Sequence, residues 1–256
     1  MSVNKTDITW CHWTWNPISG CSRGCDYCYA RKIAERFKDN YPRGFMPTCF
    51  PGRLNDLDKW YTYRANKPVR NEGDIIFVGS MGDIFDPAIP TAFIHEVLDS
   101  MARWNFHEFM ILTKRVERVE MVVHEYMTSE DFDFSSLDHI HFGFTATTQN
   151  MYNYSIEQSH IFDFVSFEPI QEAISPDIEW EHGSGAVFEA LANMKLMIVG
   201  AQTPGLPLHK IHRDWLEGII YASTASSVPV HYKHGGTNPE YEGKIYNALI
   251  DGRNGK

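Results

Sequence analysis

The sequence has 256 residues, of which 43% are apolar and 22% charged, values usual for a folded globular protein. It contains no apolar run near the roughly 20 residues that span a bilayer and no secretory-type start, so we expect a cytoplasmic protein without a membrane partner. The formal net charge of −10 argues against duplex DNA binding as the main function, because proteins that bind duplex DNA carry a basic face. The five cysteines are an odd number, which argues against a disulfide framework.

The first marked feature along the chain is a group of three cysteines, Cys21, Cys25 and Cys28, in a C-x3-C-x2-C spacing. After them, residues from about 38 to 71 are rich in proline, glycine and aromatic residues. We expect this segment to be an irregular insertion that is either packed on the fold or forms a lid. Trp60, Tyr61 and Tyr63 are candidate stacking surfaces within it, although ordinary packing explains the same residues.

From residue 74 onward, short apolar runs alternate with stretches of helical length. The runs are Asp74–Gly79, Phe109–Thr113, His139–Thr145, Asp163–Phe167, Leu196–Gly200 and Val228–Tyr232. Buried parallel strands have this continuous apolar character.

Helical spacing of apolar residues marks the segments between these runs. Pro90–Arg103 places Phe93, Val97, Leu98 and Met101 on one side, and Val116–Met127 and His212–Ala225 behave in the same way. Alternating strands and helices predict an α/β fold with a parallel sheet, either open or curled into a barrel. We expect a single domain over residues 1–256.

Polar residues follow the strand runs, where ligands of parallel α/β folds bind. These tips are Ser80–Asp83, Lys114–Arg115, Ala146–Gln149, Glu168–Pro169, Ala201–Gln202 and Lys233–His234. A lone carboxylate at a strand end is more easily explained by function than by packing, so Glu168 is a candidate catalytic residue. Lys114 is a second candidate, together with Arg115, for pairing with a carboxylate or phosphate. Lys233 and His234 are candidates for proton transfer or anion binding.

The three close cysteines admit three explanations from spacing alone. Three thiolates on one loop can hold an iron–sulfur cluster and leave one iron without a protein ligand, so that a small molecule binds the metal directly. The same thiolates with His12 or another histidine can hold zinc. Three unrelated buried thiols are the third explanation. The α/β context favours the cluster, because small zinc modules seldom stand at the start of a strand–helix series.

The cysteine motif, with the aromatic Tyr27 before its third cysteine, resembles the signature of the radical SAM superfamily. The resemblance implies a [4Fe-4S] cluster on Cys21, Cys25 and Cys28 whose open iron binds S-adenosylmethionine. It further implies reductive cleavage to methionine and a 5′-deoxyadenosyl radical, which abstracts hydrogen from a substrate. An electron donor such as flavodoxin or ferredoxin is implied as partner.

The resemblance extends along most of the chain to an uncharacterised radical-SAM-related family common in phages and bacteria. Its marks are Thr14–Pro17, Gly20–Cys21, Gly24–Ala30, Phe77–Asp83, Leu112–Arg115, Ser166–Pro169, Ile198–Gly200 and Tyr232–Gly236. It implies a partial (β/α)6-type TIM barrel, the radical SAM core, with the cluster loop after the first strand. If the protein is encoded by a phage, its compartment is the host cytoplasm.

The resemblance also implies cofactor-binding roles. Ser80, Met81, Gly82 and Asp83 stand where the superfamily has a glycine-rich turn that accepts hydrogen bonds from the SAM ammonium group, with Tyr27 nearby. Asp83 is alternatively a turn or capping residue. Thr145 and Gln149 are expected at the ribose hydroxyls, where ordinary turn chemistry is the alternative, and Gly200 is expected in the same cofactor site.

The chain departs from this family pattern in three places. The first cysteine spacing is shorter, Thr147-Thr148-Gln149 replaces a Glu-Asn-Gln-like tip, and Ala201-Gln202 replaces a Gly-Glu pair. These changes affect the expected ribose contacts and the substrate class more than the cluster. The phage relatives point to a nucleotide or a DNA base, such as a modified thymine, as the substrate, and a flipped base needs only a pocket and local cations.

Overall fold

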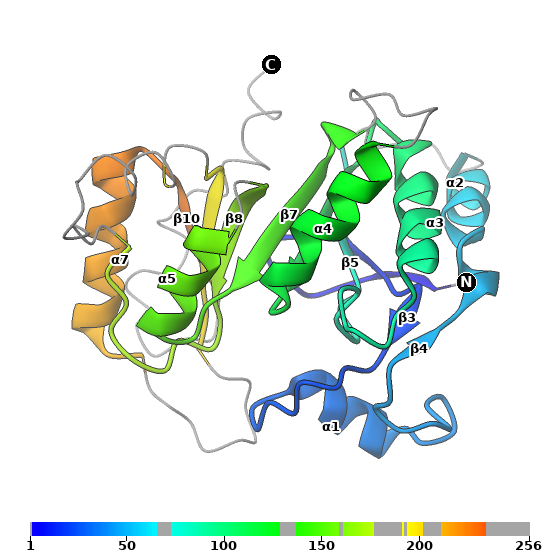
Figure 1. The fold of residues 1–256 in the computed structure, drawn as a ribbon, viewed down its shortest axis with the longest axis horizontal. Helices are drawn as coiled ribbons and strands as arrows, with labels where there is room; N and C mark the ends of the chain where they lie inside the picture. Colours follow the sequence, from blue (N-terminus) through cyan, green and yellow to red (C-terminus); the bar gives the residue numbers. More distant parts are fainter. Residues whose placement is uncertain are drawn as a thin grey trace. The chain divides into compact units, whose positions relative to one another are not determined.

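The computed structural model describes residues 2–65, 73–128, 137–158, 161–176, 191, 194–201 and 211–233, without the side chains of 61–65 and 158. The chain forms two compact units, Met1–His141 and Phe142–Lys256, which we call the first and second units. Each unit is an α/β structure built on mostly parallel strands (Figure 1). Among the helices that the structure describes, none is long and apolar enough to cross a membrane.

The strands of the first unit lie in the order β1-β2-β5-β6. They comprise β1 (Val3–Lys5), β2 (Trp13–Trp15), β5 (Ile75–Val78) and β6 (Glu108–Thr113). β1 is antiparallel to β2, whereas β2, β5 and β6 are parallel. A separate two-stranded ribbon pairs β3 (Ile18–Ser19) with β4 (Thr48–Cys49). The carboxyl ends of β2, β5 and β6 therefore lie at one edge of this sheet.

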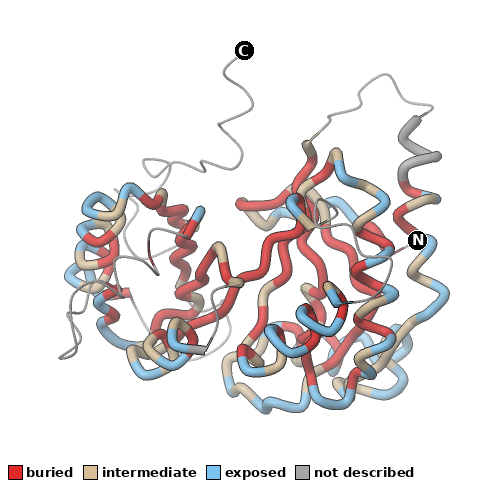
Figure 2. Tube along the Cα trace, turned by 45° about the horizontal axis from the view of Figure 1, so that its top comes forward, coloured by how far each residue is buried: buried red, intermediate tan, exposed pale blue. Residues whose placement is uncertain are grey.

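The helices of the first unit are α1 (Tyr29–Arg36), the 3-10 turn η1 (Pro51–Arg53), α2 (Asp56–Ala65), α3 (Thr91–Ala102) and α4 (Val116–Met127). The four apolar side chains predicted to share one side of α3 are buried, so that helix and its inward face are confirmed. The helix begins at Thr91, one residue later than predicted, and Pro90 is its N-cap residue. All four residues of β5 are buried, as a strand covered on both faces requires (Figure 2).

The second unit continues from β7 (Ile140–Thr145), which starts at the unit boundary, in the strand order β7-β8-β9-β10. The other strands are β8 (Phe162–Phe167), β9 (Leu196–Val199) and β10 (Val230–Tyr232), all parallel. Helices α5 (Gln149–Gln158) and α7 (Arg213–Ser226) complete the part that the structure describes. Tyr152 of α5 packs on Phe144 and Phe167, so α5 covers the strand face that carries these two rings.

All six predicted strand runs are present, and the predicted α/β class is confirmed. The expected irregular segment is corrected between residues 48 and 65, where β4, η1 and α2 form. Trp60 is not a stacking surface, because it is buried against Trp13 and His107. The side chains of Tyr61 and Tyr63, and residues 66–71 of the segment, lie outside the described part. Packing rather than hydrophobic periodicity organises this segment, so its sequence alone did not predict the helix.

Candidate functional site at the cysteine loop

The three cysteines lie on a loop, residues 20–28, between β3 and α1 in the first unit. Cys28 is the N-cap of α1, where its Sγ accepts a hydrogen bond from the N–H of Arg31 at 3.4 Å. Cys21 Sγ accepts one from the N–H of Arg23, also at 3.4 Å. Gly24, just before Cys25, has a positive φ of 77°, a conformation that glycine adopts without steric cost. The loop thus follows β2, the first parallel strand, after one short ribbon strand.

The start of this loop is joined to the turn after β5 by the close approach of two glycines. Gly20 N–H donates to the carbonyl of Met81 at 2.9 Å, and Gly20 and Gly82 form a parallel bridge. A Cβ on Gly82 would lie 2.5 Å from the carbonyl oxygen of Gly20. Gly20 has a φ of 84°, and a Cβ there would lie 2.3 Å from the carbonyl oxygen of Met46. Neither position has room for a side chain.

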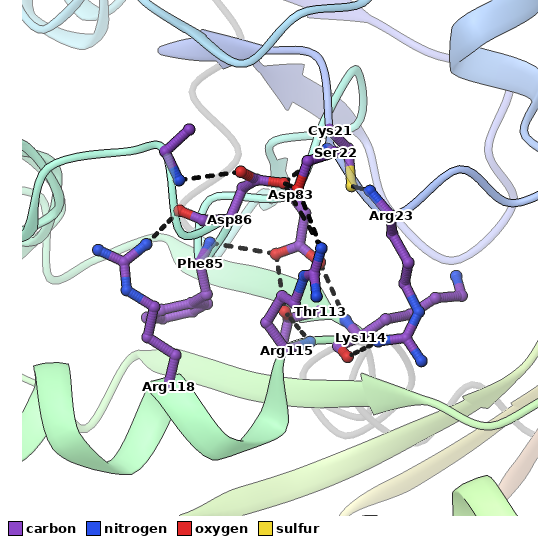
Figure 3. A network of polar contacts seen from close by, with 11 residues as sticks. Cys21, Ser22, Arg23, Asp83, Phe85, Asp86, Thr113, Lys114, Arg115 and Arg118 are labelled. Atoms are coloured by element: carbon purple, nitrogen blue, oxygen red, sulfur yellow. Dashed lines mark hydrogen bonds and ion pairs between the residues drawn. The ribbon is translucent and has the colours of Figure 1, made fainter.

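Asp86 holds the residue that follows the first cysteine. Its Oδ2 accepts hydrogen bonds from the backbone N–H and the hydroxyl of Ser22, both at 2.7 Å (Figure 3). Arg115 donates to the same hydroxyl at 3.0 Å and lies 4.0 Å from the carboxylate. Burial acts to raise the pKa of Asp86, but these donors outweigh it and hold the pKa below its usual value. Sequence reasoning missed Asp86, because its partner is 64 residues away.

The Asp83 carboxylate is held by hydrogen bonds from other residues of the protein. It accepts hydrogen bonds from the hydroxyl of Thr113 at 2.7 Å, the N–H of Lys114 at 3.0 Å and the N–H of Phe85 at 3.1 Å. Burial raises its pKa, against the lowering effect of these bonds. The contact with Phe85 is the turn-type bond that the alternative explanation of Asp83 anticipated. The carboxylate connects the tips of β5 and β6 (Figure 3).

Further polar contacts surround the turn after β5. Asn16, directly after β2, accepts hydrogen bonds from the N–H of Met81 at 2.9 Å and the hydroxyl of Ser80 at 3.1 Å. The hydroxyl of Tyr29 donates to the carbonyl of Ser80. The tips of β2 and β5 and the first residue of α1 are thereby joined.

A cationic rim lies next to the cysteines. The guanidinium of Arg23 donates to the carbonyl of Lys114. The ammonium group of Lys114 lies 5.7 Å from the centre of the Tyr27 ring, a cation–π distance. The structure therefore brings together Tyr27 and Lys114, two predicted site residues that lie far apart in the sequence.

The donor set on this loop fits an iron–sulfur cluster. Cys21, Cys25 and Cys28 are all free thiols of intermediate exposure. Burial raises the pKa of Cys21 to about 12, which favours the thiol, and a bound metal would have to displace its proton. Hydrogen bonds from backbone N–H groups to sulfur, as at two of these thiols, are a feature of cluster sites.

The alternative single zinc site is not formed in the part of the chain that the structure describes. No three His, Cys, Asp or Glu side chains there converge on one ion. The Nδ1 atom of His12, the histidine nearest in sequence, instead accepts a hydrogen bond from the N–H of Ile75 at 2.8 Å. A cluster does not require such convergence, because each thiolate binds a different iron.

A second group of predicted residues meets in the second unit. Lys233, after β10, forms an ion pair with Glu168, after β8, and each side chain is about a quarter exposed. Gly200, after the intervening strand β9, lies under this pair: a Cβ there would be 2.9 Å from the carboxyl carbon of Glu168. The structure thus unites two predicted catalytic residues with a predicted cofactor-binding glycine.

The other predicted residues of the second unit have structural partners. The side chain of Gln149 accepts from the N–H of Ser175 and donates to Asn153, each at 2.7 Å, which holds residues 171–175 against α5. Thr145 is buried and pairs with Ser166 across the sheet. Gln202 and His234 lie outside the described residues.

Comparisons with known proteins place the chain in a family. A family model described as "Protein of unknown function (DUF5131)" matches residues 5–254. The chain belongs to the DUF5131 family. No curated protein matches the sequence.

Solved structures similar to the chain include two of spore photoproduct lyase. A double mutant with bound AdoMet and dinucleoside spore photoproduct matches with a TM-score of 0.50 and 13% identity over 86% of this chain. The enzyme complexed with dinucleoside spore photoproduct matches with a TM-score of 0.48 and 12% identity, also over 86%. The chain spans 62% of the length of each of these proteins. The first likeness shows the fold, and the predicted resemblance to a radical-SAM-related family is confirmed at that level.

Proposed function

We propose that this protein is a radical SAM enzyme in which Cys21, Cys25 and Cys28 hold a [4Fe-4S] cluster with one iron open to S-adenosylmethionine. The observation that carries the proposal is the cysteine loop itself. Its three free thiols stand on a segment held at both ends to the carboxyl edge of a parallel sheet, by Gly20–Gly82 and by Tyr29–Ser80. Ligand sites of parallel α/β folds lie at this edge.

When bound, the cluster supplies one electron that cleaves S-adenosylmethionine into methionine and a 5′-deoxyadenosyl radical, which takes a hydrogen atom from the substrate. The protein's own residues orient the reactants and exclude water. We assign the SAM ammonium group to the carbonyls of Ser80 and Met81, because each carbonyl has a second lone pair beside its present bond. Gly82 allows the turn to lie close to the cysteine loop, and the Asp83 carboxylate anchors the turn through its hydrogen bonds with Thr113 and Lys114.

The remaining predicted residues receive roles in the same proposal. Lys114, stacked on Tyr27 beside the cysteines, offers its ammonium group to a carboxylate or phosphate of SAM or substrate. Glu168 and Lys233 are proposed as a proton-transfer pair for the substrate, over Gly200. Thr145 and Gln149 remain proposed neighbours of the ribose. An external donor such as a flavodoxin or ferredoxin supplies the electron.

The substrate that we propose is a nucleotide or a DNA base, with a thymine-derived group as the leading choice and rearrangement or repair as the reaction. Spore photoproduct lyase was solved with dinucleoside spore photoproduct, which supports this class. The net charge of −10 favours contact with one base or nucleotide over long contact with a duplex.

The decisive experiment is anaerobic cluster reconstitution, reduction with dithionite, and chromatography of 5′-deoxyadenosine formed from S-adenosylmethionine. The Cys25→Ala variant is compared with Cys49→Ala, which removes a free thiol that lies outside the loop. We expect iron binding and 5′-deoxyadenosine from the wild type and Cys49→Ala, and neither from Cys25→Ala. A colourless, iron-free wild type that holds one zinc ion would refute the proposal. A brown protein that does not cleave S-adenosylmethionine would indicate a degenerate fold with a structural cluster.

A further inference from the structure

Exposed apolar side chains gather on and beside α1, next to the cysteine loop. Tyr29, Ile33 and Phe37 are 37%, 37% and 46% exposed and recur every four residues, so they form one stripe along the helix. Met46, 59% exposed, follows Phe45, whose ring carries the guanidinium of Arg31 at 5.1 Å. Of the seven large apolar side chains that are exposed in the described residues, four belong to this region. We call these four residues and their charged neighbours the α1 face.

The α1 face is basic within an acidic protein. Residues 22–46 contain six cations and three acidic residues, a net charge of +3 in a chain of −10, so the remainder carries −13. The cations are Arg23, Arg31, Lys32, Arg36, Lys38 and Arg43, all at least partly exposed. Arg36 also lies over the ring of Phe37, at 5.2 Å. An apolar centre with aromatic, methionine and arginine residues, rimmed by cations, is the composition of a protein-binding surface.

The position of this face relates it to the cysteines. Cys28 caps α1, and the buried side of the helix consists of the small residues Ala30 and Ala34. In Figure 1, α1 lies at the edge of the first unit, away from α2, α3 and α4. A partner seated on α1 would therefore approach within one helical turn of a predicted cluster ligand.

We propose that the α1 face docks an acidic protein that carries one electron, of the flavodoxin or ferredoxin class, and that the electron enters the protein there. This inference rests on the proposed function, whose chemistry requires an electron that the chain itself does not hold. The carrier is oxidised by one electron and the cluster is reduced by one. Charge complementarity selects an acidic partner, because residues 22–46 carry a net charge of +3. The exposed Ile33 and Met46 favour a protein over a nucleic-acid strand, which would use cations and aromatic rings alone.

The test compares two reductants and two kinds of variant. Arg36→Glu and Phe37→Ser change the rim and the centre of the α1 face. Lys5→Glu gives the same charge change as Arg36→Glu, but Lys5 pairs with Trp13 at the amino end of β2, the opposite edge from the cysteines. Formation of 5′-deoxyadenosine is measured at low salt with an enzymatically reduced flavodoxin and, separately, with dithionite. Affinity for labelled oxidised flavodoxin is measured by fluorescence anisotropy, which needs no turnover.

We expect Arg36→Glu and Phe37→Ser to lower the flavodoxin-driven rate and the flavodoxin affinity about tenfold or more, with the dithionite-driven rate unchanged. Lys5→Glu should resemble the wild type in all three measurements. Equal flavodoxin affinity in Arg36→Glu and Lys5→Glu would overturn the inference. So would selective loss of affinity for a single-stranded oligonucleotide, which would assign the face to nucleic acid. If flavodoxin binding depends on Arg36 but dithionite yields no 5′-deoxyadenosine, the docking surface stands and the proposed radical chemistry fails.

Discussion

Glu168 and Lys233 form an ion pair directly over the backbone of Gly200. Their strands, β8 and β10, flank β9, and the carboxyl group of Glu168 fills the space where a side chain at position 200 would begin. We propose a chemical role for this pair, because it lies at the strand tips where parallel α/β folds bind their ligands.

The first prediction concerns this pair. We expect Glu168→Gln and Lys233→Gln each to lower the rate of 5′-deoxyadenosine formation at least tenfold, and the double variant to lose no more than either, because the two groups act as a unit. Gly200→Ala should cause a similar loss with both charges present, since its Cβ would displace the carboxylate. Losses that multiply in the double variant would contradict the coupling. Full activity of Gly200→Ala would contradict the need for glycine.

The second prediction concerns the close approach of the cysteine loop to the turn after β5. Gly20→Ala and Gly82→Ala should each lower the free energy of unfolding by roughly 2–4 kcal/mol, because backbone atoms stand where the Cβ would go. Gly24→Ala should cost about 1 kcal/mol, because only its positive φ is unfavourable. Gly52→Ala, in open space without a positive φ, is the control and should have almost no effect. Urea denaturation measures all four, and an equal cost at Gly24 and Gly82 would refute the packing argument.

The third prediction concerns pH. The pKa of Asp86 is held below its unfolded value, so its stabilisation is present above the unfolded pKa of about 3.9 and disappears as the pH falls through the lower folded pKa. We expect Asp86→Asn to be less stable than the wild type by about 2 kcal/mol at pH 7, because Ser22 loses its charged acceptor. The difference should shrink below about pH 4. Urea midpoints at pH 7, 5 and 3 measure it, and a constant difference would exclude this role of the charge.

The fourth prediction separates Lys114 from the cluster. Its backbone N–H and carbonyl bind Asp83 and Arg23, and its ammonium group lies over the Tyr27 ring. Lys114→Met should therefore leave the fold and the iron content intact and weaken the binding of S-adenosylmethionine about tenfold, as expected for loss of one charge-assisted contact. Anaerobic equilibrium dialysis measures the affinity. Loss of iron in this variant would show instead that the lysine supports the cysteine loop.

Apolar runs and helical spacing were sufficient to predict the six later strands and the helices α3, α4 and α7. Each is long enough for its periodicity to be distinctive, and burial on both sides of a parallel strand leaves a continuous apolar run such as Ile75–Val78. The ribbon strands β3 and β4 have two residues each, too few for any pattern, and α2 was hidden in a segment rich in aromatic residues. The signal that marked the cysteine loop was local, since three ligands within eight residues need no distant partner.

What the sequence by itself determined is the set of chemically capable groups and the strand tips that carry them: Cys21, Cys25 and Cys28, the turn after β5, and Glu168 and Lys233. What only the tertiary structure decided is how these groups are held. Asp83 proved to be a connector of two strand tips, Asp86 emerged as the acceptor for Ser22, and Gly200 made room for an ion pair. The physical reason is that hydrogen bonds and steric contacts between residues 30 or more positions apart depend on strand register and helix packing. Neither strand register nor helix packing produces a periodic pattern in the amino-acid sequence.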